Sequence, residues 1–134
     1  MGLALRLAAR ALGRTSPNPV VGAVVVKDGR IVGKGYHRMA GGPHAEIVAM
    51  RRAGEAARGA TLYVTLEPCC HHGRTAPCSE SVIASGVSRV VVGCRDENPL
   101  VSGRGIEAIR SAGIDVSVGV RGEVCEEIAA PFFT

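Results

Sequence analysis

The chain has 134 residues, of which 46% are hydrophobic and 21% charged, and its formal net charge is +4. This length suffices for one domain with a buried core, and the composition excludes a disordered chain. No apolar run approaches the ~20 residues of a membrane-spanning helix, and the N-terminal arginines are scattered among apolar positions rather than grouped as in a signal peptide. We therefore expect a single cytoplasmic domain over residues 1–134 that makes no use of a membrane.

The first elements are a helix and a hairpin. An amphipathic pattern predicts a helix over residues 3–12 that ends at Gly13, and "TSPNP" predicts a rigid turn that holds Asn18 between two prolines. The β-rich runs 20–26 and 30–37 are separated by Lys-Asp-Gly, a hairpin signal. We expect an antiparallel pair of strands.

The rest of the chain alternates helices with strands. The pattern predicts helices at 44–53, 78–85, 103–112 and 123–130, and strands at 61–66, 89–94 and 114–118. Such an order, with right-handed crossovers, predicts an α/β fold: a three-layer α/β/α sandwich around a mixed five-stranded sheet.

Two unusual clusters fall where a helix is expected to begin. The first, "GGPHAEIVAM", opens a helix with His44 and Glu46, and the second is "EPCCHHGRTAPC" over residues 67–78. The simplest interpretation of Glu46 is an anion in the first turn, where the helix dipole favours it. However, ligands in open α/β sheets also gather at the carboxyl ends of strands, where helices begin.

The cysteines favour a metal. Cys69, Cys70 and Cys78 lie within ten residues, beside His71 and His72. In a chain without a signal peptide this clustering indicates metal binding rather than disulfides. A catalytic zinc ion takes three protein ligands and leaves the fourth position to water, and His44 with two of the cysteines supplies that set. Glu46 could then move the proton of the water, while His71 and His72 stay open as additional ligands.

The order of these motifs resembles a known family. "HAE", followed by "PC" and a further cysteine, resembles the zinc-dependent nucleobase deaminases, whose signature is H-x-E with a later P-C-x-x-C. Here the second cysteine follows Cys69 by nine residues rather than three. That longer form, with "PNPVVGAVVVKDG", "GYH", "TLEPC", "HHGRTAPC" and "DENPLVSGRG", resembles the deaminases of bacterial riboflavin biosynthesis over nearly the whole chain.

The resemblance implies a cytidine-deaminase-like fold, Zn²⁺ as cofactor and a role for each matching residue. Glu46 would be the catalytic proton shuttle, and the zinc ligands would be His44, Cys69 and Cys78. The substrate site would contain Asn18, His37, His71, Arg74, Asp96 and Asn98. Asn18 could also be a plain turn former and His37 an exposed strand end. Two positions depart from the pattern: Cys70 replaces the usual serine and Glu97 the usual proline. Cys70 leaves open which adjacent cysteine binds zinc, although the Pro-Cys pairing favours Cys69.

The implied reaction is hydrolytic deamination of 2,5-diamino-6-ribosylamino-4(3H)-pyrimidinone 5′-phosphate, a small-molecule substrate. Arg74 and His71, in the long loop between the cysteines, would bind its phosphate. The alternative is a deaminase for another free base or nucleotide, such as cytidine, dCMP or guanine. A structural zinc site, closed by four ligands, would leave Glu46 without a role. The resemblance also implies a homo-oligomer and a reductase domain that is either fused or separate.

Other partners and sites are not expected. Two Tyr, two Phe and no Trp leave little for stacking the bases of a nucleic acid. "GRGIEA" over residues 103–108 matches a dinucleotide fingerprint, but it does not follow its strand directly, so we expect no NAD(P) binding. Cys94 and Cys125 are interpreted as ordinary buried cysteines.

Overall fold

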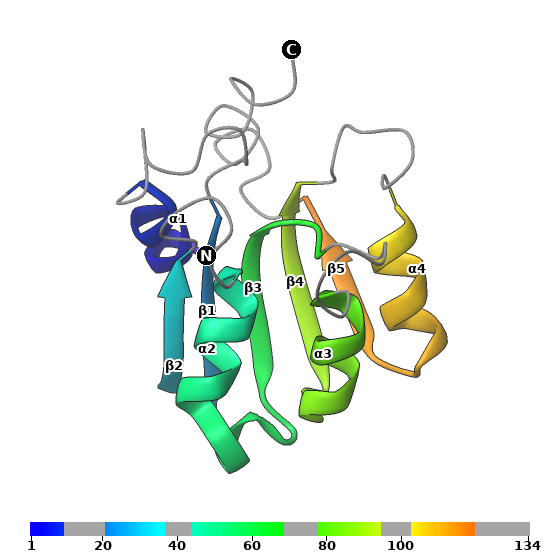
Figure 1. The fold of residues 1–134 in the computed structure, drawn as a ribbon, viewed down its shortest axis with the longest axis horizontal. Helices are drawn as coiled ribbons and strands as arrows, with labels where there is room; N and C mark the ends of the chain where they lie inside the picture. Colours follow the sequence, from blue (N-terminus) through cyan, green and yellow to red (C-terminus); the bar gives the residue numbers. More distant parts are fainter. Residues whose placement is uncertain (10–20, 37–43, 69–77, 95–102, 120–134) are drawn as a thin grey trace.

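The computed structural model describes residues 1–9, 21–36, 44–68, 78–94 and 103–119. Its elements follow the expected order of helix, hairpin and alternating helices and strands (Figure 1). They are α1 (Gly2–Ala9), β1 (Gly22–Lys27), β2 (Arg30–Tyr36), α2 (Ala45–Ala53), the 3-10 helix η1 (Gly54–Ala57), β3 (Thr61–Leu66), α3 (Cys78–Ser85), β4 (Arg89–Cys94), α4 (Arg104–Ser111) and β5 (Asp115–Val118).

The strands form one mixed sheet. Its order is β2-β1-β3-β4-β5, with β1 antiparallel to both neighbours and β3, β4 and β5 parallel to one another. The hairpin between β1 and β2 turns at Asp28 and Gly29, whose φ angles are 51° and 77°. Two successive positive φ angles are what a tight hairpin turn of matching twist requires, and Asp-Gly tolerates them. The predicted antiparallel pair and five-stranded sheet are confirmed.

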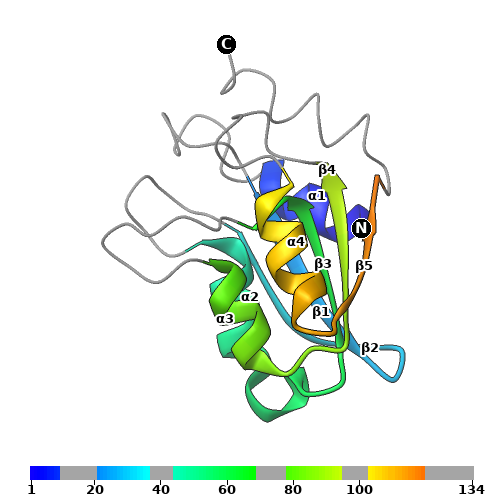
Figure 2. The same cartoon turned by 90° about the vertical axis from the view of Figure 1, so that its right-hand side faces the viewer.

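Helices cover both faces of the sheet, which confirms the three-layer sandwich. Alternate residues of β1 show the two sides: Val24 packs with Ala4 and Leu7 of α1, whereas Ala23 and Val25 belong to the main core. Helices α2, α3 and α4 lie on that second side, opposite α1 (Figure 2). The core therefore sits mainly between the sheet and these three helices.

Glycines bring α2 directly onto β2. A Cβ atom at Gly33 would overlap the backbone oxygen of Ala49, and one at Gly35 would lie 2.7 Å from side-chain atoms of Val48. Because neither glycine carries a side chain, the helix packs against the strand backbone. This contact fixes the helix that follows His44 and holds Glu46 in its first turn.

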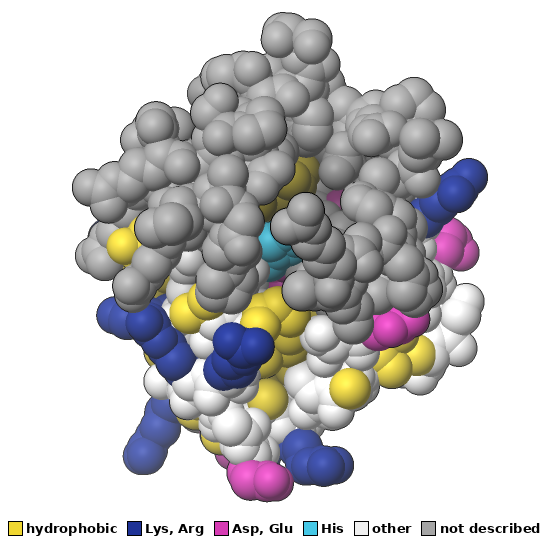
Figure 3. Space-filling view, in the orientation of Figure 1, with side chains coloured by type: hydrophobic (Ala, Val, Ile, Leu, Met, Phe, Trp, Pro, Cys, Tyr) yellow, Lys and Arg dark blue, Asp and Glu magenta, His cyan; other side chains and the backbone are white. Residues whose placement is uncertain are grey.

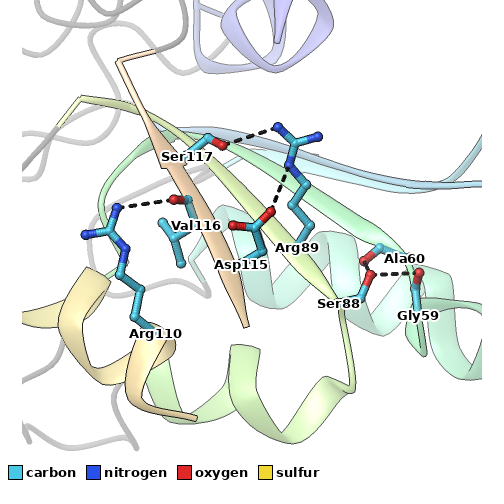
Figure 4. A network of polar contacts seen from close by, with 8 residues as sticks. All are labelled: Gly59, Ala60, Ser88, Arg89, Arg110, Asp115, Val116 and Ser117. Carbon is cyan, nitrogen blue, oxygen red and sulfur yellow. Dashed lines mark hydrogen bonds and ion pairs between the residues drawn. The ribbon is translucent and has the colours of Figure 1, made fainter. Parts of the chain in front are cut away.

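Polar contacts fasten β5 to the rest of the sheet (Figure 4). Arg89 of β4 donates to Ser117 Oγ at 3.2 Å and lies 3.9 Å from Asp115, while Arg110 of α4 donates to the carbonyl of Val116 at 3.2 Å. The ion pair is largely exposed, and pairs of that kind contribute little to stability. The backbone pairing with β4 and the burial of Val116 hold the strand in place.

The structure adjusts some predicted bounds. Helix α1 begins at Gly2, one residue earlier than expected, and the predicted residues 10–12 lie outside the described part. Helix α2 continues after Ala53 as the unexpected 3-10 helix η1. The helix predicted at 123–130 lies outside the described residues. Among the described helices, none has the length and apolar character needed to cross a membrane.

Candidate active site

Two helices begin at the edge of the sheet where the parallel strands end. The N-terminal ends of α2 and α3 both lie at the carboxyl end of β3 and β4 (Figure 1). His44 is the residue before α2, in an extended conformation with φ −72° and ψ 157°, and Cys78 is the first residue of α3. The junctions identified in the sequence are therefore real junctions of the fold.

Glu46 is buried in the first turn of α2. The residue is 3% exposed, and the helix buries Ala45, Glu46, Ala49 and Met50 on one side. Glu46 and Met50 are four residues apart, so the carboxylate lies on the face that packs into the protein. An acidic residue that served only the helix dipole could stay in water, and buried glutamates are rare unless they are paired. The burial favours a specific role for Glu46.

His44 lies beside that carboxylate. Its Nδ1 is 3.8 Å from Glu46 Oε1, and its side chain is 45% exposed whereas that of Glu46 is 4% exposed. His44 makes no side-chain hydrogen bond that would cap the helix. The pair thus joins an accessible imidazole to a buried carboxylate, as expected if the ring binds a ligand at the surface of the site and the carboxylate acts behind it.

The other predicted site residues are only partly within the described region. For Cys78 the backbone is described and the side chain is not. The remaining predicted residues lie outside the described part: Asn18, His37, Cys69, His71, Arg74, Asp96 and Asn98, as do Cys70, His72, Glu97 and Cys125. Within the described residues no three His, Cys, Asp or Glu side chains form a metal-binding group. The roles predicted for the residues outside the described part therefore stay predictions.

The donor set nevertheless fits a catalytic zinc ion. The accessible imidazole of His44 and the start of α3 at Cys78 lie at the same edge of the sheet. Cys69 directly follows Pro68, the last described residue after β3. One imidazole and two thiolates make the three-ligand set of a catalytic site, and a helix N-terminus such as that of α3 favours a thiolate.

Glu67 is a further buried carboxylate that sequence reasoning missed. It is 4% exposed, and its Oε1 accepts the N–H of Gly103 at 2.9 Å. Its Oε2 accepts the N–H groups of Gly105 and Ile106 at 3.0 and 3.3 Å. Two sequence features could have indicated this contact. One is an acidic residue between a buried strand and Pro-Cys, and the other is a helix start that contains two glycines.

The same contacts explain the sequence that resembled a dinucleotide fingerprint. The first N–H groups of α4 are the donors that a dinucleotide phosphate would need. Here they donate to the carboxylate of Glu67. Gly105 lies so close to the carbonyl of Pro68 that a Cβ atom would overlap it. The glycine therefore serves close packing within the protein.

Two neighbouring features are not part of the zinc chemistry. Cys94 is buried beside Leu5 and Leu66, and its thiol donates to the carbonyl of Thr65 at 3.5 Å, which confirms an ordinary buried cysteine. Apolar side chains also reach the surface over α2 and α3 (Figure 3). The groove there is lined by Ile47, Met50, Arg51, Ser81, Ala84 and Ser85. None of these six offers an imidazole, thiol or carboxylate.

Comparison with known proteins identifies the class. Residues 1–94 match the family model of the cytidine and deoxycytidylate deaminase zinc-binding region. The chain belongs to this family, and its cofactor is Zn²⁺. The match includes both junction segments, with His44, Glu46 and Cys78.

The similar proteins include riboflavin biosynthesis proteins of several bacteria. The chain is 60% identical over all of its 134 residues to riboflavin biosynthesis protein RibD of Aquifex aeolicus, of which it covers 38%. RibD of Acinetobacter baumannii is 49% identical with a TM-score of 0.96, over 98% of this chain and 37% of that one. A Thermotoga maritima diaminohydroxyphosphoribosylaminopyrimidine deaminase/5-amino-6-(5-phosphoribosylamino)uracil reductase is 52% identical with a TM-score of 0.92, over 98% of this chain and 38% of that one. The chain thus spans just over a third of the length of these relatives.

Proposed function

We propose that this chain catalyses the hydrolytic deamination of 2,5-diamino-6-ribosylamino-4(3H)-pyrimidinone 5′-phosphate. The observation that carries the proposal is the buried Glu46 beside the accessible imidazole of His44, at the edge of the sheet where α3 begins with Cys78. The 49 to 60% identity to riboflavin biosynthesis proteins supports this substrate over another base or nucleotide.

In the proposed site, His44, Cys69 and Cys78 hold the metal. Zinc, when bound, supplies a Lewis acid that makes water acidic enough to react near neutral pH. Glu46 accepts a proton from the attacking water as its oxygen bonds to the amino-bearing ring carbon. Glu46 delivers that proton to the ring nitrogen, then takes the second proton from the added hydroxyl group and passes it to the amino group, which leaves as ammonia while the carbon becomes a carbonyl. The burial of this carboxylate, which shields it from bulk solvent, supports this role.

Substrate recognition is proposed for residues that the family resemblance assigns. Arg74 and His71 would bind the 5′-phosphate, because a guanidinium makes strong charge-assisted hydrogen bonds to phosphate oxygens. The base and ribose would contact four further side chains: Asn18, His37, Asp96 and Asn98. The net charge of +4 is compatible with a phosphorylated substrate.

The assembly and surroundings of the enzyme form part of the proposal. The Thermotoga maritima relative joins a deaminase to a reductase, and we propose that a reductase, fused or separate, uses the product of this chain. A homo-oligomer is proposed from the family resemblance alone. Clustered cysteines that serve a metal suit a reducing, cytoplasmic compartment.

The direct test is an ammonia-release assay on the zinc-loaded chain. The substrates are the proposed aminopyrimidine phosphate, its dephosphorylated form, cytidine, dCMP and guanine. The expected result is ammonia release that is fastest with the phosphorylated aminopyrimidine. Faster release from cytidine, dCMP or guanine would assign the chain to another deaminase activity.

A further inference from the structure

Glu67 supplies the N-terminal cap of a distant helix. Its carboxylate accepts three backbone N–H groups, from Gly103, Gly105 and Ile106, at 2.9 to 3.3 Å. These are donors that a helix cannot satisfy internally, and an ionised carboxylate also suits the positive end of the helix dipole. A helix is usually capped by its own Ser, Thr, Asp or Asn. Here the cap position is Gly103, with φ of 79°, and the capping oxygen comes from 36 residues away.

The backbone of Glu67 holds the end of a second element. Its N–H donates to the carbonyl of Cys94, the last residue of β4, at 2.9 Å. Cys94 directly precedes the segment 95–102, and Gly103 directly follows it. One residue therefore binds the described chain on both sides of the segment that carries Asp96 and Asn98.

Close packing joins α4 to the residue before Cys69. A Cβ atom at Gly105 would overlap the carbonyl oxygen of Pro68 and would lie 3.4 Å from Cγ of Glu67. The carbonyl cannot move without moving the peptide that leads into Cys69. The start of α4 and the chain entering the first cysteine therefore form one packed unit.

We propose that Glu67 is a positioning residue. It couples Pro68, which leads into the cysteine segment proposed to bind zinc, to Cys94 and Gly103, which flank the segment 95–102. The assignment of these segments to zinc and substrate rests on the proposed function, while the coupling rests on the contacts of Glu67. A buried carboxylate that accepts three hydrogen bonds has one low-energy arrangement. A shift at the proposed zinc site therefore changes the hydrogen bonds from Glu67 to the start of α4, and a shift of α4 likewise changes the position of the zinc site.

The first test uses Glu67→Gln, which keeps the size of the side chain but removes the charge and presents an amide N–H₂ toward backbone donors. The matched control is Glu107→Gln, the same change at an exposed position in the first turn of α4. In Glu67→Gln we expect about 10-fold faster hydrogen exchange at Gly103, Gly105 and Ile106, and about 10-fold faster release of zinc to a chelator. KM for the aminopyrimidine phosphate should rise more than kcat falls, and the control should match the unsubstituted chain.

The second test needs no substitution at Glu67. Zinc is removed from the unsubstituted chain with a chelator, and amide exchange is compared with the zinc-loaded form. Coupling predicts faster exchange at Gly103, Gly105 and Ile106, whereas the central β4 amides of Val91 and Val92 should change little. This comparison tests the coupling even if Glu67→Gln does not fold.

The outcomes separate the coupling from the proposed function. If Glu67→Gln speeds exchange at α4 but leaves zinc release and KM at the control values, Glu67 is only a helix cap and the proposal is overturned. Unchanged exchange at these amides after zinc removal would overturn it as well. If the chain releases no ammonia from any aminopyrimidine, yet zinc removal loosens α4 as expected, the proposed function fails while the coupling stands.

Discussion

Two buried glutamates, Glu46 and Glu67, lie near the same edge of the sheet, and their contacts indicate different roles. Glu67 accepts hydrogen bonds from three backbone N–H groups, which fixes the carboxylate as part of the scaffold. Glu46 lies 3.8 Å from Nδ1 of His44, the predicted zinc ligand. Its carboxylate is therefore next to the proposed metal site, whereas that of Glu67 caps a helix.

The identity of the zinc ligands is tested by serine substitutions at two cysteines. Cys78 begins α3, and Cys70 is the position where the family resemblance leads us to expect serine. Serine is a poor ligand for zinc, so Cys78→Ser should lose the metal, while Cys70→Ser should retain about one zinc per chain. Metal content is measured by atomic emission on the purified chain. Retention in Cys78→Ser, or loss in Cys70→Ser, would overturn the ligand assignment.

Phosphate recognition is tested by Arg74→Ala. A charge-assisted hydrogen bond contributes about 1.5 to 3 kcal/mol, so kcat/KM for the phosphorylated aminopyrimidine should fall roughly 10- to 100-fold. The dephosphorylated substrate serves as the control, since it lacks the group that Arg74 would bind, and its kcat/KM should hardly change. Steady-state ammonia release measures both. Equal losses on the two substrates would show that Arg74 supports the loop rather than the phosphate.

The helices α2, α3 and α4 present their N-terminal ends at one edge of the sheet, and close backbone contacts fix two of them. Gly33 and Gly35 let α2 rest on β2, and Gly105 lets α4 rest on Pro68. At Gly33 and Gly105 the nearest atoms are backbone oxygens, which cannot move aside as the end of a flexible side chain can. The site therefore depends on helix positions that glycines determine.

Gly33→Ala tests that dependence for α2. The added methyl group would overlap the carbonyl of Ala49, so α2 must move outward, and overpacking of this kind costs about 1 to 3 kcal/mol. We expect a clear fall in the midpoint of urea unfolding and a loss of ammonia release, because Glu46 moves with the helix.

The control for that variant is Gly113→Ala, after α4, where a Cβ atom meets no neighbour and only the positive φ of 87° is strained. This change should cost about 1 to 2 kcal/mol of unfolding free energy and leave kcat and KM unaltered. If the two variants lose activity equally, the position of α2 on β2 is not what sets the site.

At the scale of the whole molecule, local patterns were sufficient to predict most of the architecture. The apolar run 61–66 became β3 with those bounds, and the Asp-Gly signal became the turn between β1 and β2, because burial and turn geometry act within a few residues. Helix α2 began within one residue of the predicted start, since Gly-Gly-Pro precedes it. The 3-10 helix η1 was missed because nothing in "GEAA" distinguishes it from the end of α2.

The site was predictable to a similar depth. His44 and Glu46 are two residues apart, so their pairing at the start of α2 follows from the local sequence and is seen in the structure. The cap that Glu67 provides to α4 was not predictable, because it depends on chain segments 36 residues apart that only the folded sheet brings together. The ligand role of Cys69 and Cys78 stays a prediction from the motif.

The central claim is that Glu46 moves protons at a zinc site without binding the metal. Glu46→Gln keeps the shape of the buried side chain but removes its basic oxygen, and the matched control is Glu55→Gln, whose side chain is 96% exposed. The decisive measurement is ammonia release together with zinc content on the same preparations. We predict that kcat falls by at least about 100-fold in Glu46→Gln while zinc content equals that of the control, because general acid–base catalysis contributes roughly 10²- to 10⁴-fold. Activity close to that of the control, or loss of the zinc along with the activity, would contradict the claim.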